Sequence, residues 1–138
     1  MNALVFDTTI ALGLCFEDRI DATVLQTVET LRSRDALVPA HWRLQVGQQL
    51  LEAERHRRIS ATDRSQFLQL LDALLPLVDS ETSAQAWLRT WQLAQEHSLN
   101  LEDAAYLELA QRYNVPLASC NKELVRAATK IGLPSLPG

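Results

Sequence analysis

The sequence has few cysteines and no long apolar run. Its two cysteines, Cys15 and Cys120, form no CxxC motif, and no basic leader precedes a long apolar segment. We therefore expect neither a disulfide framework nor export, and a reduced cytoplasm is the expected location. The apolar runs fall far short of the ~18 residues that cross a membrane, so we expect no transmembrane segment. Cys120 has no evident His or Asn partner, which favours a small buried side chain over a nucleophile.

An excess of positive charge is also lacking. The 138 residues carry 13 Lys and Arg against 17 Asp and Glu, a formal net charge of −4. This balance argues against nucleic-acid binding by bulk charge, so any such contact has to be local. One stretch, residues 43–64, is locally basic. We favour solvated helix ends for it, and the alternative is a surface for RNA or an acidic partner. Its cationic side chains are Arg43, Arg55, His56, Arg57, Arg58 and Arg64.

Short apolar segments alternate with helix-type patterns along the chain. The predicted strands are Ala3–Phe6, Ala36–Val38, Leu77–Val78 and Pro116–Cys120. The predicted helices cover residues 10–16, 21–34, 40–58, 60–75, 80–97, 100–113 and 122–131, and residues 132–138 form an irregular tail. No repeat, low-complexity segment or linker interrupts this order. The alternation favours a three-layer α/β/α fold with a small central parallel sheet, and the length favours one domain over residues 1–138.

Several polar residues lie where predicted strands end or predicted helices begin. Asp7 follows the strand Ala3–Phe6, and Asn121 follows the strand that Pro116 begins. Asp103 lies in the first turn of the helix that Asn100 caps. In open α/β sheets, ligands bind outside the carboxyl ends of the strands, so we expect these residues to converge. Taken alone, Asp7 and Asp103 are each better explained as a helix cap or a hydrogen-bonded end residue than as a ligand.

The sequence resembles the PIN-domain ribonucleases in four segments, which occur in the family's order and span nearly the whole chain. They are LVFDTTIAL at residues 4–12, VPAHWRLQV at 38–46, LEDAAYLELA at 101–110 and PLASCNKEL at 116–124. The closest resemblance is to the toxin members of VapBC-type toxin–antitoxin pairs. It implies a PIN-like fold, a metal-dependent endoribonuclease activity, an RNA substrate, a cognate antitoxin and a homodimer.

In such proteins four acidic residues usually hold Mg²⁺ or Mn²⁺ at the C-terminal edge of the sheet. Asp7 and Asp103 match the first and third acids, and Thr9 matches a neighbouring hydroxyl residue. Gln45 stands where the family usually has Glu, and Asn121 stands where it usually has Asp. Because two carboxylates supply half the usual charge, we expect one weakly held ion at Asp7 and Asp103. Thr9, Gln45 and Asn121 are then auxiliary catalytic residues.

Three other acids are candidates to replace the missing carboxylates. Glu52 shares a helix face with Gln45 but lies about 10.5 Å along the axis, which is too far. Glu102 points about 100° away from Asp103 if both are helical, so it is not an obvious replacement. Glu123, two residues after Asn121, is the best of the three.

Two sets of apolar side chains are candidate contact surfaces. Trp87 and Trp91 are four residues apart on one predicted helix face, which favours core packing or a protein interface over base stacking. Leu12, Leu14 and Phe16 are expected to be exposed, and the resemblance makes them contact points for an antitoxin.

The amides leave more than one function open. The first hypothesis is a weakened but active one-metal endoribonuclease. The second is a catalytically degenerate PIN domain that binds RNA or a protein without cutting. An oligomeric α/β domain of unrelated role is the third.

Overall fold

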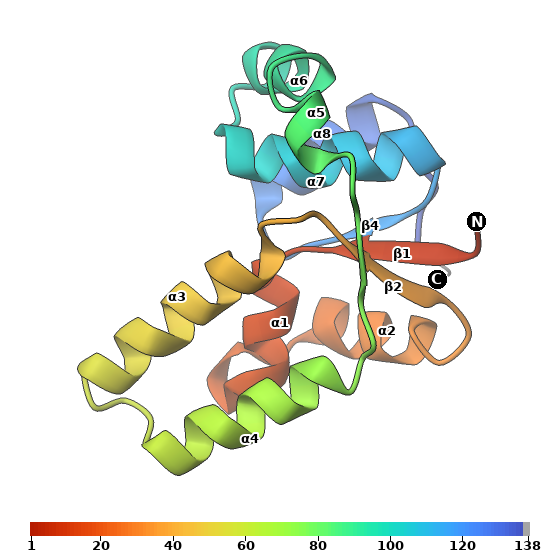
Figure 1. Cartoon of the computed structure of the whole chain (residues 1–138). Helices are drawn as coiled ribbons and strands as arrows, with labels where there is room; N and C mark the ends of the chain where they lie inside the picture. The colour runs from red at the N-terminus through yellow and green to blue at the C-terminus, as the bar shows by residue number, and fades with distance from the viewer. Residues whose placement is uncertain (137–138) are drawn as a thin grey trace.

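The computed structural model describes residues 1–136, in which four parallel strands lie between two layers of helices (Figure 1). The strands are β1 (Ala3–Phe6), β2 (Asp35–Val38), β3 (Leu77–Val78) and β4 (Leu117–Ala118), in the sheet order β3-β2-β1-β4. Every residue of β1 is buried, because parallel sheets are covered on both faces. The predicted three-layer α/β/α fold is confirmed.

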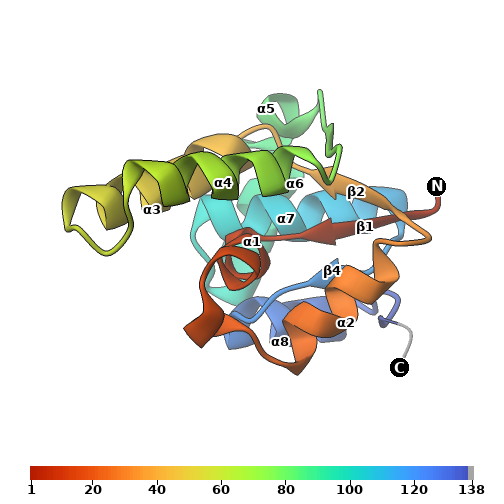
Figure 2. The same cartoon turned by 90° about the horizontal axis from the view of Figure 1, so that it is seen from below.

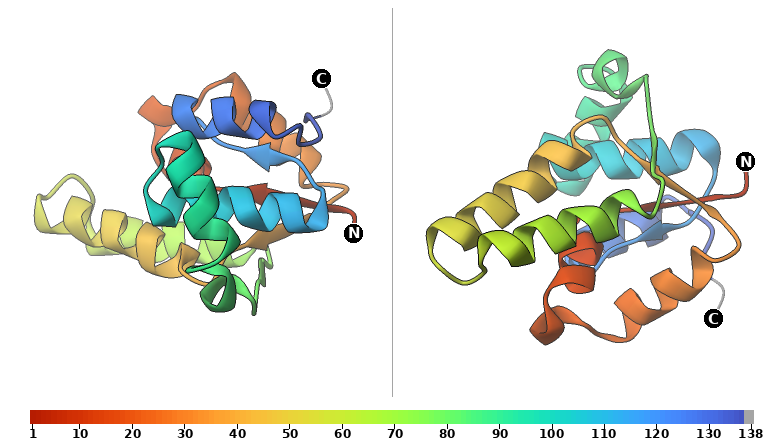
Figure 3. Two further views of the ribbon diagram at one scale, coloured as in Figure 1. Left: turned by 90° about the horizontal axis from the view of Figure 1, so that it is seen from above. Right: turned by 60° about the horizontal axis from the view of Figure 1, so that its bottom comes forward.

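Helices cover both faces of this sheet. Their bounds are α1 Thr8–Cys15, α2 Ala22–Thr30, α3 Trp42–Arg55, α4 Ala61–Asp72, α5 Thr82–Gln85, α6 Arg89–His97, α7 Leu101–Tyr113 and α8 Lys122–Lys130, with a short 3₁₀ turn at Glu17–Arg19. In Figure 1, α5 to α8 lie above the sheet, and α1 to α4 lie below it. Helices α3 and α4 form a hairpin that projects away from the sheet (Figures 2 and 3).

Strand register brings the end of β1 beside the end of its neighbour β4, an outer strand of the sheet. Val5 pairs with Leu117 and Phe6 pairs with Ala118. The residues that follow β1 and β4 therefore leave the sheet side by side, and the N–H of Asp7 donates to the carbonyl oxygen of Ala118 at 3.3 Å. This edge is the carboxyl end of both strands, where α/β proteins place their ligands.

Large apolar side chains from both layers fill the core against β1. The ring of Phe6 packs edge-on against Trp42 with centroids 5.7 Å apart, which fixes the start of α3 under the sheet. Helix α7 is the central helix of the upper layer, and its residues from Ala104 to Ala110 are all buried.

The helix predicted over residues 80–97 is two helices in the structure. Leu88 has φ −113° and ψ −109°, a non-helical conformation that separates α5 from α6. The side chains that α6 buries are Thr90 and Leu93, whereas Trp87 is 85% exposed and Trp91 is 48% exposed. These exposures exclude core packing for the two tryptophans, and the alternative prediction, a protein interface, stays a prediction.

Three further expectations about exposure were wrong. Leu12 is buried and Leu14 and Phe16 are half-buried, because α1 lies between its neighbours α2 and α3. Phe16 packs against Phe67 of α4 with ring centroids 5.6 Å apart. Cys120 is exposed because it follows the last residues of β4 at the rim of the sheet.

The remaining elements agree with the sequence pattern within a few residues, and the tail is irregular over residues 132–136. Residues 137–138 of the predicted tail lie outside the described residues. Within residues 1–136, no helix is both long and apolar enough to span a bilayer.

Candidate functional site

Asp7 is a buried carboxylate between the end of β1 and the start of α1. It caps α1 by accepting the N–H of Thr9 at 3.1 Å, and the Thr9 hydroxyl donates to the same oxygen. The hydroxyl of Ser119, just after β4, donates to its other oxygen. Burial raises the pKa of Asp7, and the hydrogen bonds from Ser119 and Thr9 partly offset this rise. Asp7 is thus held rigidly between two neighbouring strand ends.

Backbone groups after β4 complete this frame. The N–H of Cys120 donates to Thr9 Oγ1 at 2.8 Å, and the N–H of Asn121 donates to Ser119 Oγ at 2.9 Å. The side chain of Thr9 therefore contacts both Asp7 and the chain leading to Asn121. These links place Thr9 beside Asp7, where the sequence predicted an auxiliary residue.

Asp103 lies in the first turn of α7, which begins where Asn100 accepts the N–H of Asp103 at 2.7 Å. Burial raises the pKa of Asp103, and the negative charges of Asp7, Glu102 and Glu123 raise it further. Three neighbouring carboxylates thus act on Asp103 at this edge of the sheet. Such a concentration of like charge is unfavourable unless a cation or a proton neutralises it.

Asn121 joins this group through its amide nitrogen. Its Oδ1 accepts the N–H groups of Glu123 at 3.0 Å and Leu124 at 3.3 Å, which is the N-cap of α8. Because those N–H groups can only donate, the side-chain oxygen has to face them and Nδ2 has to point the other way. Nδ2 donates to Asp103 Oδ2 at 3.4 Å. Asn121 therefore presents a donor to the acidic group, and its oxygen is committed to the helix.

Gln45 presents a donor in the same way. Its Oε1 accepts the hydroxyl of Tyr106 at 2.6 Å, and its Nε2 donates to Glu102 Oε2 at 2.8 Å. Glu102 was not expected at the site because its side chain points away from that of Asp103 on their shared helix. The N-terminal turns of α3 and α7 face each other, so Glu102 reaches Gln45 across the gap between them. Glu102 is the acid that the sequence analysis undervalued.

The other candidate acids have different surroundings. Glu52 accepts a hydrogen bond at 3.2 Å from Gln48 on its own helix, as its distance along α3 predicted. Glu123 is exposed in the first turn of α8, and its charge acts on Asp103.

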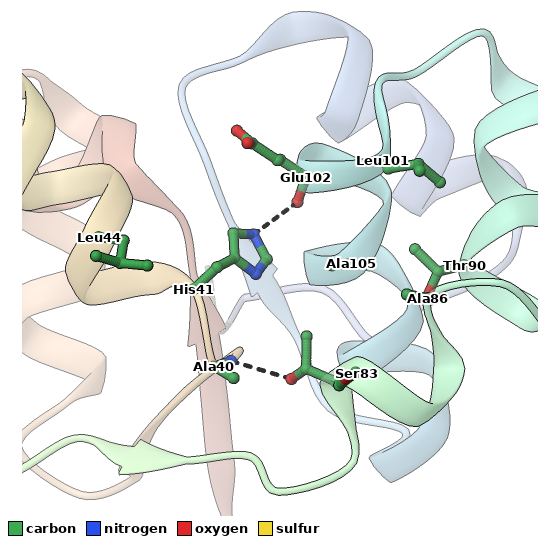
Figure 4. A pocket seen from close by; sticks show the side chains of 10 residues that line it. Ala40, His41, Leu44, Ser83, Ala86, Thr90, Leu101, Glu102 and Ala105 are labelled. Carbon is green, nitrogen blue, oxygen red and sulfur yellow. Dashed lines mark hydrogen bonds between the residues drawn. The ribbon is translucent and has the colours of Figure 1, made fainter.

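His41 is a site neighbour that the sequence analysis did not single out. Its Nε2 donates to the carbonyl oxygen of Glu102 at 3.1 Å (Figure 4). Its ring also packs edge-on against Tyr106. Burial lowers the pKa of His41, against the opposing charges of Glu102 and Asp103. A cavity of about 320 Å³ lies beside this ring, and apolar side chains such as Leu44, Leu101 and Ala105 line it. The position of His41, shortly after β2 and at the same edge of the sheet as Asp7, was the feature of the sequence that could have identified it.

The family described as PIN domain matches residues 4–130. The chain belongs to the PIN domain family. PIN domains are generally nucleases that act on RNA and use divalent metal ions. The matched range contains Asp7, Gln45, Asp103 and Asn121. A comparison with curated proteins found no match.

The donor set of this PIN domain fits one divalent ion better than two. Among residues 1–136, no three His, Cys, Asp or Glu side chains are grouped closely enough to hold a metal. Mg²⁺, however, is commonly bound through one or two carboxylates, with water and substrate phosphate completing the octahedron. Asp7 and Asp103 are the two carboxylates that would hold such an ion, while the amide nitrogens of Gln45 and Asn121 cannot be ligands in the orientation described. A two-ion site lacks the carboxylates it needs.

Proposed function

We propose that this PIN domain is an endoribonuclease of the toxin–antitoxin type, with a weakened site for one Mg²⁺ or Mn²⁺ ion at Asp7 and Asp103. The observation that carries this proposal is the placement of Asp7 and Asp103 at one edge of the sheet, where Ser119 donates to Asp7 and Asn121 donates to Asp103. The charges of Glu102 and Glu123 also act on Asp103. No Lys or Arg of residues 1–136 forms an ion pair with any of these four carboxylates. A divalent cation supplies the missing positive charge.

The residues around the two acids have separate roles in this proposal. A bound ion lowers the pKa of a water molecule and stabilises charge on the phosphate. Thr9 holds Asp7 in place, and Ser119 does the same from β4. Gln45 and Asn121 present N–H donors, which suit the non-bridging oxygens of a phosphodiester rather than a metal ion. Glu102 adds a carboxylate where Gln45 lacks one.

The resemblance to toxin members supplies the rest of the proposal. We propose that residues 1–138 act as one domain in the cytoplasm, form a homodimer and bind a cognate antitoxin. The half-buried Leu14 and Phe16 remain possible contact residues, whereas the buried Leu12 is not accessible.

The decisive test is the substitution Asp7→Asn. It keeps the shape of the α1 cap but removes the best-held carboxylate, so Mg²⁺-dependent cleavage of a structured RNA should be abolished. Glu52→Gln on α3 is the matched control, because it removes one charge outside the site and should leave cleavage unchanged. Cleavage that persists in Asp7→Asn, or that proceeds in EDTA, would overturn the mechanism.

Glu102→Gln tests the added carboxylate separately. We expect Mg²⁺ affinity, measured by calorimetry, to fall by roughly 3- to 10-fold, because an acid near the ion is neutralised. Equal affinities for wild type and Glu102→Gln would restrict the site to Asp7 and Asp103.

A second candidate function rests on the amide orientations. Asn121 Nδ2 donates to Asp103 and Gln45 Nε2 donates to Glu102, so each of these two acids already has an amide donor as a partner. This arrangement favours a catalytically degenerate PIN domain that binds RNA or protein without cutting. The result expected for it is no heat of binding at millimolar Mg²⁺ or Mn²⁺, together with retained binding of RNA.

A further inference from the structure

Three cationic side chains form a row along α8. Lys122, Arg126 and Lys130 are spaced four residues apart, and each is exposed. Lys122 and Lys130 are the only two lysines of the chain. With a rise of 1.5 Å per residue, neighbouring cations of this α8 row are about 6 Å apart along the axis. The row lies opposite the face of α8 that buries Leu124 and Ala127.

The α8 row has no ionic partner among residues 1–136, whereas five arginines of the molecule form ion pairs. None of its members forms a hydrogen bond or ion pair with residues 1–136. In contrast, Arg43 pairs with Asp72, and Arg64 pairs with Glu54. Three unpaired cations in one line are notable in a chain with a net charge of −4.

Helix stability does not account for this arrangement. Lys122 is the first residue of α8, where the positive end of the helix dipole disfavours a cation. Lys122 and Arg126 are an i,i+4 pair of like charge, which is mildly destabilising in a helix. Only Lys130, in the last turn, has a charge that suits its position. The row is therefore better explained by something it binds.

The α8 row begins beside the candidate site. Asn121 caps α8 and donates to Asp103, so Lys122 is one residue away from a site residue. Farther along, Arg126 and Lys130 line a groove of about 280 Å³ between α8 and the end of α6. Two acids, Glu96 and Glu123, also line this groove.

Those two acids do not cancel the row. Glu96 lies 3.7 Å from Arg89, a cation on its own helix. Glu123 belongs to the group of carboxylates around Asp103. The row therefore keeps its positive charge, although it begins beside the acidic group around Asp103.

We propose that the α8 row binds the sugar–phosphate backbone of the RNA strand that enters the site. This inference rests on the proposed function, which makes RNA the substrate. A line of cations with regular spacing matches a polymer with regularly spaced phosphates, and its first member adjoins the residues that would meet the scissile phosphate. Backbone contacts of this kind set register and affinity and carry no sequence information. An acidic protein segment is the competing occupant, and the experiment separates the two.

Salt dependence of RNA binding tests the proposal without relying on cleavage. Binding of a fluorescent single-stranded RNA of roughly 12 nucleotides is followed by anisotropy in EDTA over a series of salt concentrations. The triple variant Lys122→Gln, Arg126→Gln, Lys130→Gln should reduce the slope of log K against log salt by about 2, since each phosphate contact contributes about 0.7. Circular dichroism checks that α8 and the fold persist.

The matched control is Arg55→Gln, Arg57→Gln, Arg58→Gln at the exposed turn of the α3–α4 hairpin. It removes the same charge from three exposed cations, none of which has an ion pair within residues 1–136. We expect its slope to equal that of the wild type. An equal loss of slope in both triple variants would mean that bulk charge alone causes the effect, which would overturn the proposal. An unchanged slope in the α8 variant would overturn it as well.

The outcome is distinguishable from failure of the nuclease proposal. A protein that does not cleave in Mg²⁺ but shows an α8-dependent salt slope supports the row and refutes the nuclease. A protein that cleaves RNA in Mg²⁺, but whose α8 variant retains the full salt slope, supports the nuclease and refutes the α8 row. Poly-glutamate that binds the row as tightly as RNA would instead identify a surface for acidic proteins and reject the RNA proposal.

Discussion

Two groups of carboxylates pack against opposite halves of α7, and only one of them contains an arginine. At the N-terminal end, Asp103 lies near Asp7, which follows β1. In the C-terminal half, Arg112 donates to Asp79, which follows β3, at 2.9 and 2.8 Å. Arg112 also donates to Glu108 at 2.8 and 2.9 Å. Both groups thus combine a carboxylate at the exit of a parallel strand with an acid on α7.

Arg112 makes the pKa shift of Asp79 opposite in direction to that of Asp103. Burial acts to raise the pKa of Asp79, but hydrogen bonds from Arg112 and Thr82 outweigh it, and the pKa lies below its usual value. The pKa of Asp103 is raised by burial and by neighbouring acids. The Arg112 group therefore connects α7 to the strand end after β3. The Asp103 group has no such arginine or lysine partner among residues 1–136.

The largest expected effect comes from removing the arginine. Arg112→Met leaves Asp79 and Glu108 buried without a counter-ion, so the free energy of unfolding should fall by about 3 kcal/mol, at the lower end for buried pairs because Arg112 is partly exposed. A fall in Tm of roughly 10 °C should follow. Arg32→Met is the control, because its pair with Glu29 is exposed and worth less than about 1 kcal/mol. Equal losses in the two variants would remove the distinction between the groups.

A smaller effect is expected from restoring acids at the candidate site. The double substitution Gln45→Glu, Asn121→Asp replaces two amide donors with carboxylates and should raise Mg²⁺ affinity by at least about 10-fold. In EDTA the same variant should unfold at a lower temperature than the wild type, because it adds like charges. Calorimetry and thermal unfolding with and without Mg²⁺ measure both effects. Unchanged affinity would mean that two carboxylates suffice.

The smallest expected effect is a gain in stability from Asp103→Asn in EDTA. The ionised form of Asp103 is disfavoured in the folded state, so neutralising it should stabilise the protein at neutral pH by on the order of 0.5 kcal/mol. The gain should shrink as pH falls through the raised pKa and vanish below 3.8, where wild-type Asp103 is protonated in both states. Unfolding in EDTA across this pH range measures the difference. A gain that persists at low pH would rule out charge repulsion as its cause.

The sequence was a sufficient guide to features that depend on local order. The apolar runs at Ala3–Phe6 and Ala36–Val38 predicted β1 and β2 closely. The exits of β1 and β4 were also predictable, because parallel strands share one carboxyl edge. These predictions needed only short-range patterns and a general rule about sheets.

Tertiary placement determined what the sequence could not show. The bond between Gln45 and Glu102 joins residues 57 apart, and that between Arg112 and Asp79 spans 33. Neither follows from helix periodicity, which describes directions only within one helix. The break at Leu88 was not predicted because the residues around Leu88 include no Pro or Gly, which would have marked the end of a helix.

The cap at Asn121 also bears on how this protein can evolve. Asn and Asp begin helices about equally well, so an exchange between them at residue 121 leaves the start of α8 intact. The same exchange changes the charge beside Asp103. The chemistry of this edge can therefore change without loss of the α8 cap, and any cost in stability comes from the added charge rather than from the start of the helix.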